Sequence, residues 1–465
     1  MFMRKCFFLS LFVGLLGIAN AQNKWVVAGP MPGYVEFRTA KIWVELGAGA
    51  KNAAIKYWKA DAPKAIQTKP FSGNFNSHFK TIQITLTDLA INTTYNYEII
   101  VNDMPTKKGG SFTTTNLWQY QKQVPEFSFL TGSCAYFNEP GFDRLFTDMV
   151  LLNQPAIPYG GDSTIFETMA KEKAAFMLWL GDNWYTRDAD YGSEWGLWYR
   201  AHRDRSLPVL QNFLKAMPHY AIWDDHDYGP NDADKSYILK EQSREVFMNY
   251  WANPSYGLGG QGIYTKLGYA DCDFFLMDDR WFRSSDYMNA FIDGKPNAEK
   301  RMWGQQQMDW LKNQLLMSKA PFKFIVTGSQ TLNPVSKSDC LQDYPIEYNE
   351  LMDFFKTEKI NGVLFLTGDR HHSEVIKMER QGLYPLYDIT SSPLTSGVSK
   401  VQGQELTNEA RITGTLVEAL NYTRISISGK GRERVLKAEF LGINGEKLAE
   451  WSVSENELRV PPVIK

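Results

Sequence analysis

The sequence predicts a layered α/β domain preceded by a small all-β sandwich. Two observations carry this prediction. Residues 24–120 contain short segments rich in β-branched and aromatic residues, broken by Gly, Pro, Asn and Asp, which is typical of a small sandwich. From Phe127 onward, short and nearly continuous apolar runs alternate with helical segments, as buried strands do in an α/β fold.

The N-terminal region shows its strands in the segments KIWVEL, AIKYWKA, TIQITLTDL and TYNYEIIVND. Strands of this length and spacing favour a sandwich of the fibronectin or immunoglobulin type. We expect Tyr95 and Tyr97 to form a packing corner. The polar stretch 116–126 marks the boundary, so the predicted domains are residues 24–120 and 126–465.

The second region repeats one pattern five times, an apolar run that ends in a polar turn. The runs are FSFLTGSC at 127–134, FMLWLGDNWY at 176–185, YAIWDDHD at 220–227, FKFIVTGSQ at 322–330 and VLFLTGDRHH at 363–372. Helices are expected over 196–217 and 302–318. The tail after residue 421 is predicted to be β again, because Asn444-Gly445 is a strong hairpin signal.

The first 21 residues are predicted to be a cleaved secretory signal peptide. A short basic segment precedes a short apolar core, and Ala19-Asn20-Ala21 is a small-x-small cleavage site. Neither a lipoprotein-type cysteine nor a twin arginine is present, so we expect the general export route to the periplasm or the medium. No later apolar run is long enough to anchor the chain in a membrane.

Composition narrows the class of partner. A net charge of −2 argues against nucleic acid as a bulk electrostatic partner. Beyond the signal, the cysteines are Cys134, Cys272 and Cys340, an odd number at wide spacing that predicts a free thiol rather than a disulfide framework. We also expect a monomer.

Polar side chains gather at the ends of the five predicted strands. They are Cys134 after the first; Asp182, Asn183 and Tyr185 after the second; Asp225, His226 and Asp227 after the third; Ser329 and Gln330 after the fourth; and Asp369, His371 and His372 after the fifth. Each motif alone could be a turn, an Asp-capped helix or a buried cysteine. Ligands of α/β folds collect beyond the carboxyl ends of strands, so together the five ends indicate a dinuclear metal centre.

In these motifs the chain resembles the PhoD-like alkaline phosphatases, relatives of the purple acid phosphatases and other calcineurin-like metallophosphoesterases. The matching motifs are GSC at 132–134, GDNWY at 181–185, WDDHD at 223–227, MDDRWFR at 277–283, GQQQMDWL at 304–311, GDRHH at 368–372 and ITSSPLTS at 389–396. The resemblance implies a four-layer α/β/β/α metallophosphatase domain with its site at the strand ends.

The resemblance also implies residue roles. Asp182 would bridge two metals. The first metal would also bind Cys134, Tyr185 and His371, and the second would bind Asp225, which stands where related phosphatases have asparagine, together with Asp369. His226 would act beside Asp182 in catalysis. Asn183 and Arg280, with Arg283, could meet the phosphate, although an Asp278–Arg280 pair could equally be structural.

The ligand set predicts the metals. Hard carboxylate oxygens select Ca²⁺, Mg²⁺ or Mn²⁺, whereas a tyrosinate beside a thiolate favours Fe³⁺. We therefore expect Fe³⁺ with Ca²⁺, with Mn²⁺, Mg²⁺ or Zn²⁺ as alternatives. The resemblance implies hydrolysis of phosphate mono- or diesters by a metal-activated water, with a small-molecule, lipid or polymer phosphate ester as the substrate. Alternatives are a phospholipase-type phosphodiesterase and, from another class, an exported binding protein with a vestigial site.

Overall fold

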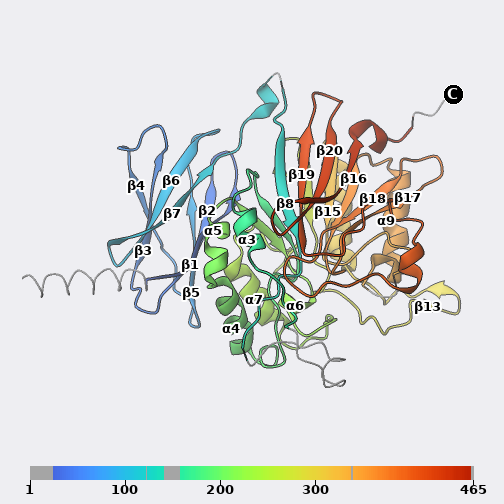
Figure 1. Cartoon of the computed structure of the whole chain (residues 1–465), viewed down its shortest axis with the longest axis horizontal. Helices are drawn as coiled ribbons and strands as arrows, with labels where there is room; N and C mark the ends of the chain where they lie inside the picture. Colours follow the sequence, from blue (N-terminus) through green and yellow to red (C-terminus); the bar gives the residue numbers. More distant parts are fainter. Residues whose placement is uncertain (1–24, 122, 141–157, 337–338, 462–465) are drawn as a thin grey trace, which may run out of the picture.

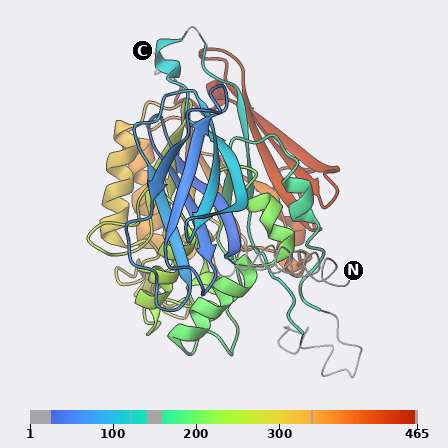
Figure 2. The same ribbon diagram turned by 90° about the vertical axis from the view of Figure 1, so that its left-hand side faces the viewer.

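The computed structural model describes residues 25–121, 123–140, 158–336 and 339–461. The predicted signal peptide lies outside these residues. The chain forms a small all-β part and a larger α/β part that pack side by side, as Figures 1 and 2 show from two directions.

The N-terminal part is a sandwich of two antiparallel sheets. One sheet has the order β1-β2-β5 and the other the order β4-β3-β6-β7. The strands are β1 (Val26–Val35), β2 (Ala40–Leu46), β3 (Ala53–Lys59), β4 (Gln67–Pro70), β5 (Lys80–Leu86), β6 (Thr94–Val101) and β7 (Met104–Thr113). Alternate residues such as Ile42, Ile55 and Ile99 fill the space between the sheets, as the alternating sequence pattern predicts.

The expected packing corner is present at Tyr95. Its hydroxyl accepts a hydrogen bond from the backbone N–H of Ala90 at 2.9 Å, which ties the start of β6 to the preceding loop. Tyr97 is buried in the sandwich core. Both tyrosines lie within β6 rather than before it, because the strand begins at Thr94.

Two six-stranded sheets form the centre of the larger part. The first has the order β10-β9-β8-β19-β20-β21 and the second the order β11-β12-β15-β16-β18-β17. The first sheet contains β8 (Phe127–Gly132), β9 (Met177–Leu180), β10 (His219–Ile222), β19 (Asn421–Ser428), β20 (Val435–Gly442) and β21 (Lys447–Ser454). The second contains β11 (Thr265–Tyr269), β12 (Cys272–Leu276), β15 (Phe322–Val326), β16 (Val363–Thr367), β17 (Glu374–Met378) and β18 (Leu386–Thr390).

All five predicted apolar strands are present, as β8, β9, β10, β15 and β16. Within their sheets, β8, β9 and β10 are parallel, and so are β15 and β16. The predicted C-terminal hairpin is also present: β20 and β21 pair antiparallel, and Gly445 has a φ of +82° in the turn between them.

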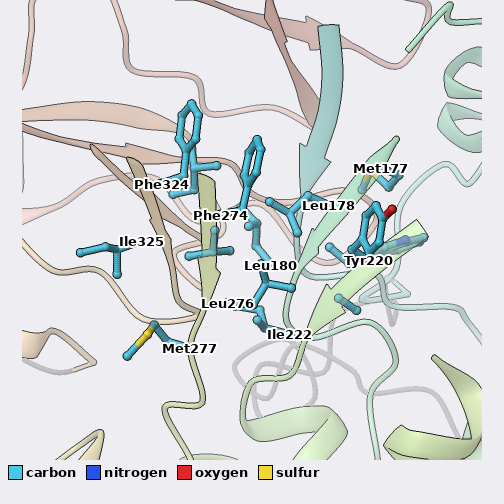
Figure 3. Packing of buried hydrophobic residues seen from close by; sticks show 14 of the residues in the cluster. Met177, Leu178, Leu180, Tyr220, Ile222, Phe274, Leu276, Met277, Phe324 and Ile325 are labelled. Atoms are coloured by element: carbon cyan, nitrogen blue, oxygen red, sulfur yellow. The ribbon is translucent and has the colours of Figure 1, made fainter. Parts of the chain in front are cut away.

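Aromatic side chains fill the space between the two sheets. The ring of Phe129 on β8 lies 5.2 Å from that of Phe274 and 5.7 Å from that of Phe324, both edge-on, and these two residues belong to the other sheet. Figure 3 shows Leu178 and Leu180 on β9 pointing toward the same layer. The high aromatic content of the chain thus serves its core.

Helices cover the outer faces of both sheets, which gives the order α/β/β/α. On the first sheet lie α3 (Ile165–Met169) and α5 (Pro208–Leu214), whose Phe166 and Phe213 pack on Trp179 of β9 at 5.9 and 5.8 Å. On the second lie α8 (Gly304–Met317) and α9 (Pro345–Thr357), whose Trp310 and Phe355 pack on that sheet. The four layers that the resemblance implied are therefore present.

The helix predicted over 196–217 is in fact two helices. They are α4 (Glu194–Arg205) and α5, and the break falls at Leu207, whose φ of −59° and ψ of 130° are not helical. Leu207 precedes Pro208, and the proline ring disfavours helical geometry in the residue before it. The single long helix was therefore wrong, and Pro208 was the signal that marked the break.

The sandwich packs on α4, α5 and the end of α7 (Lys240–Tyr250). The indole of Trp43 donates to the carbonyl of Asn249 at 2.7 Å, and Glu45 pairs with His202 of α4. A Cβ on Gly33 would lie 2.3 Å from the Cβ of Ala252, so only glycine permits this close approach.

Candidate metal centre

A first group of ligand atoms lies beyond the ends of β8, β9 and β16. Cys134, Asp182 and His371 each offer an atom within 4.8 Å of the other two. The Sγ of Cys134 is 3.6 Å from Oδ2 of Asp182, and both residues are buried. The hydroxyl of Tyr185 lies 3.4 Å from Nε2 of His371. The structure therefore brings together all four residues that were predicted to hold the first metal.

A second group shares Asp182 with the first. Asp182, Asp225 and His226 also offer atoms within 4.8 Å of one another. Oδ1 of Asp182 accepts the backbone N–H of His226 at 3.2 Å, while Oδ2 faces Cys134. One carboxylate thus directs its two oxygens toward two neighbouring groups of potential ligands, which is the arrangement a bridging ligand needs.

Among the described residues, Asp369 lies beside the two groups of ligand atoms but belongs to neither. Its backbone carbonyl is 3.6 Å from the Cys134 sulfur, and its carboxyl is buried. Burial, followed by the neighbouring charges of Asp339 and Asp225, raises the pKa of Asp369 to about 8. Asp369 thus lies close enough to Asp225, its predicted partner at the second metal, for their charges to interact.

The centre brings several buried acidic groups close together. Burial, followed by the charges of Asp225, Asp227 and Asp369, raises the pKa of Asp182 well above its usual value. Burial and the nearby charge of Asp182 likewise raise the pKa values of the Cys134 thiol and the Tyr185 phenol. A cation would favour the charged forms of all these groups, so the donor set fits a metal centre.

One carboxylate oxygen of the centre is a direct candidate for a metal ligand. Oδ1 of Asp225 is buried and has no hydrogen-bond partner among the described residues, whereas its Oδ2 accepts the backbone N–H of Asp232 at 2.7 Å. Leaving a buried carboxylate oxygen without a partner is costly. An ion bound at this oxygen would remove that cost.

The three adjacent aspartates of the WDDHD motif divide their roles. Asp225 faces the centre, whereas Asp224 forms a buried ion pair with Arg280. Asp227 accepts the backbone N–H groups of Asn183 at 3.0 Å and of Asp224 at 2.6 Å, so it ties the second strand end to the third. Asp224 also caps α6 (Asp225–Tyr228). The metal-site and capping interpretations of the motif therefore apply to different residues.

The predicted phosphate-binding residues are directed into the protein. Arg280 and Arg283 are both 0% exposed. Nε of Arg280 donates to Asp224 at 2.6 Å, and Arg283 pairs with Asp286 at 2.9 Å and also with Asp339. The structural alternative thus describes their geometry, although the side chain of Arg280 pairs with Asp224 and Asp339 and only its backbone N–H donates to Asp278.

Asn183 is also engaged within the protein. Its side-chain amide donates to the carbonyl of Ile222 at 2.8 Å and to Asp227. The phosphate-binding roles of Asn183 and Arg280 remain predictions that these contacts do not support.

The fourth strand end and His372 do not join either group of ligands. The amide of Gln330 donates to Glu374 at 2.8 Å and to Thr390 at 2.9 Å, and Nε2 of His372 lies 3.5 Å from Glu374. Ser329 accepts from Arg283 at 3.2 Å. These groups form a buried polar network behind the centre.

Two residues that contact the centre, Ser392 and Gly397, had no predicted role. Ser392 donates to the Cys134 sulfur at 3.1 Å and accepts the backbone N–H of His371 at 3.0 Å. The carbonyl of Gly397 lies 2.5 Å from Nδ1 of His371, which leaves Nε2 directed at the centre. The signal was the ITSSPLTS motif, which contains Ser392 but gives no indication of what it contacts.

Comparisons with known proteins show what this chain is similar to. The family model described as PhoD-like phosphatase matches residues 129–435. Alkaline phosphatase D of Bacillus subtilis (strain 168) is 26% identical over 294 residues, which cover 54% of this chain and 46% of that protein. The chain thus matches about half the length of this curated relative.

Solved structures show the same fold. A structure of PhoD aligns over 93% of this chain and 91% of its own, with a TM-score of 0.71 and 18% identity. The purple acid phosphatase PPD1 of yellow lupin (Lupinus luteus) aligns over 91% of this chain and 74% of its own, with a TM-score of 0.60 and 10% identity. Since the family model spans well over half of the sequence, the chain belongs to the PhoD-like phosphatase family.

Proposed function

We propose that the protein is an exported, metal-dependent phosphoesterase that hydrolyses phosphate mono- or diesters. The observation that supports it most is the position of Asp182, whose carboxylate belongs to both groups of ligand atoms. Two adjacent groups that share one carboxylate suit two cations a few ångströms apart, as two-metal hydrolases require.

In this proposal Cys134, Asp182, Tyr185 and His371 hold Fe³⁺, and Asp182, Asp225 and Asp369 hold Ca²⁺ or a similar hard ion. The reason is ligand chemistry: thiolate, phenolate and imidazole suit iron, whereas carboxylates suit Ca²⁺, Mg²⁺ or Mn²⁺. When bound, such ions stabilise charge on phosphoryl oxygens and lower the pKa of water.

The chain itself supplies orientation and proton transfer. The imidazole of His226 stacks on the Tyr185 ring, with centroids 4.1 Å apart, so it lies beside the centre. Its backbone carbonyl accepts from the N–H of Thr186 at 2.9 Å and from the Thr186 hydroxyl at 2.8 Å, which fixes the turn that carries the ring. From this position His226 would donate a proton to the leaving oxygen.

The experiment is an activity profile of the purified mature protein with metal analysis of the same sample. Mono- and diesters, including a phospholipid, are assayed before and after chelation and again after each metal is restored. Metal-dependent turnover of a phosphate ester is the expected result. Two bound metals without turnover of any ester would favour the vestigial binding protein, and preference for the phospholipid would favour the phospholipase-type enzyme.

Export rests on the sequence of the first 21 residues, which the structure does not describe. None of the described helices is both long and apolar enough to cross a membrane. N-terminal sequencing of the protein recovered from the periplasm or the medium would test the proposed cleavage after Ala21.

A further inference from the structure

A second tyrosine, Tyr159, lies next to the proposed first metal position. Its hydroxyl is 3.5 Å from Nε2 of His371, nearly the same distance as the 3.4 Å that separates this nitrogen from the Tyr185 hydroxyl. It is also 3.3 Å from Nδ1. Two phenol oxygens therefore approach the imidazole, and the sequence motifs pointed to only one of them.

The two phenols differ in their surroundings. Tyr185 is 2% exposed, and its phenol interacts with both Asp182 and Cys134, as a ligand beside these groups would. Tyr159 is half-buried, and its ring packs against those of His371, Tyr136 and Tyr185. Of the two, Tyr159 is the one that a substrate entering from solvent can reach.

The neighbouring Tyr136 restricts the position of the Tyr159 ring. Its ring packs edge-on against that of Tyr159 with centroids 4.9 Å apart, and its hydroxyl accepts a hydrogen bond from Nε of Arg187 at 3.1 Å. Arg187 is in turn anchored on Glu139 at 3.0 Å. This packing holds the Tyr159 ring in place, so its hydroxyl has a restricted position above the His371 edge.

We propose that Tyr159 is a catalytic residue that donates a hydrogen bond to a phosphoryl oxygen of the bound substrate. The inference rests on the proposed phosphoesterase function. A substrate phosphate bound beside Nε2 of His371 would come within reach of the Tyr159 hydroxyl. Hydrogen-bond donors placed where charge develops are typically worth about 10²–10³-fold in kcat.

The test compares Tyr159→Phe with Tyr191→Phe. Tyr191 is a matched control because it is also half-buried, and its hydroxyl contacts Asp188, which belongs to neither group of ligands. We expect Tyr159→Phe to lower kcat by about 10²-fold, near the low end for such donors because the residue is only partly buried. The metal content should be unchanged, and the affinity for inorganic phosphate, measured by calorimetry, should fall. Tyr191→Phe should match the wild type in all three measurements.

Two results would overturn the assignment. Loss of metal in Tyr159→Phe would make Tyr159 a metal ligand, and unchanged kcat and phosphate affinity would leave it with a packing role only. If the wild type hydrolyses no phosphate ester, the proposed function fails by itself. In that case the affinity of metal-loaded wild type and Tyr159→Phe for inorganic phosphate still decides whether Tyr159 contacts phosphate.

Discussion

Replacing Asp182 with asparagine should empty both metal positions at once. The side chain keeps its shape and loses one negative charge that both groups of ligand atoms share. At roughly 4 Å and an effective dielectric constant of about 20, one unit charge attracts a cation by roughly 4 kcal/mol for each unit of the cation's own charge, so its loss should weaken the binding of each ion by at least about 10³-fold. Metal analysis after gel filtration should therefore find little of either metal, and hydrolysis should be lost.

Variants that change a residue of only one ligand group test whether Asp182 serves both metals. Cys134→Ser removes a thiolate from the first group, and Asp225→Asn removes a carboxylate from the second. Each should lower mainly one metal. Asp188→Asn, an exposed position whose side chain contacts Tyr191, should keep both. If Asp182→Asn retained both metals, or lost one as selectively as Cys134→Ser does, the bridging role would be refuted.

Four further predictions follow from the same geometry. His226→Ala should retain both metals and lose about 10²–10⁴-fold in rate, less for a good leaving group such as nitrophenol, and metal loss would make His226 a ligand instead. Tyr185→Phe should bleach or shift the visible phenolate-to-iron band of the purified protein, and a colourless, fully active two-zinc enzyme would contradict the iron assignment. Arg280→Ala should lower the free energy of unfolding by about 3–5 kcal/mol, because it leaves buried carboxylates without their partner, whereas a raised KM at unchanged stability would support phosphate binding. The chelated protein should lose thermal stability as pH rises from about 4 to 8. The pKa of Asp227 is raised to about 7 and that of Asp369 to about 8, both above the ~3.9 of an unfolded aspartate, so in this window the folded protein binds more protons than the unfolded chain and its stability falls as pH rises. A melting temperature that increases with pH over the same range would contradict this prediction.

The sequence predicts the strands of this fold better than its helices. Runs such as Val363–Thr367 are buried on both faces, so nearly every residue must be apolar and the pattern is unmistakable. Helix boundaries depend on single residues, as the break before Pro208 shows. The short helix α6 is indicated only by its capping aspartate, because four residues carry no helical periodicity.

The candidate site was predictable only where one chain segment carries the chemistry. Cys134, Asp182, Asp225 and His371 each follow a recognisable strand, so their convergence follows from parallel strands. Ser392 contacts Cys134 across 258 positions of sequence, and Tyr159 contacts His371 across 212. Pairings over such distances are set by the packing of loops, and no local pattern in the sequence encodes them.

The backbone conformation at the strand ends bears on whether these motifs are only turns, independently of any metal chemistry. Cys134, Asp182, Asp369 and His371 all have positive φ, between +52° and +64°. Glycine adopts this region freely and Asn or Asp tolerate it, whereas most side chains pay roughly 1–3 kcal/mol. Glycine is the residue that suits such a turn best, as at Gly181 with a φ of +91°, although Lys107, Ala270 and Lys359 also have positive φ in this chain. Cysteine and histidine gain nothing conformationally at these positions, and their side chains are the ones that point at Asp182. At Cys134 and His371 the proposed metal site supplies a reason for this conformation, because it needs their sulfur and nitrogen atoms close to Asp182.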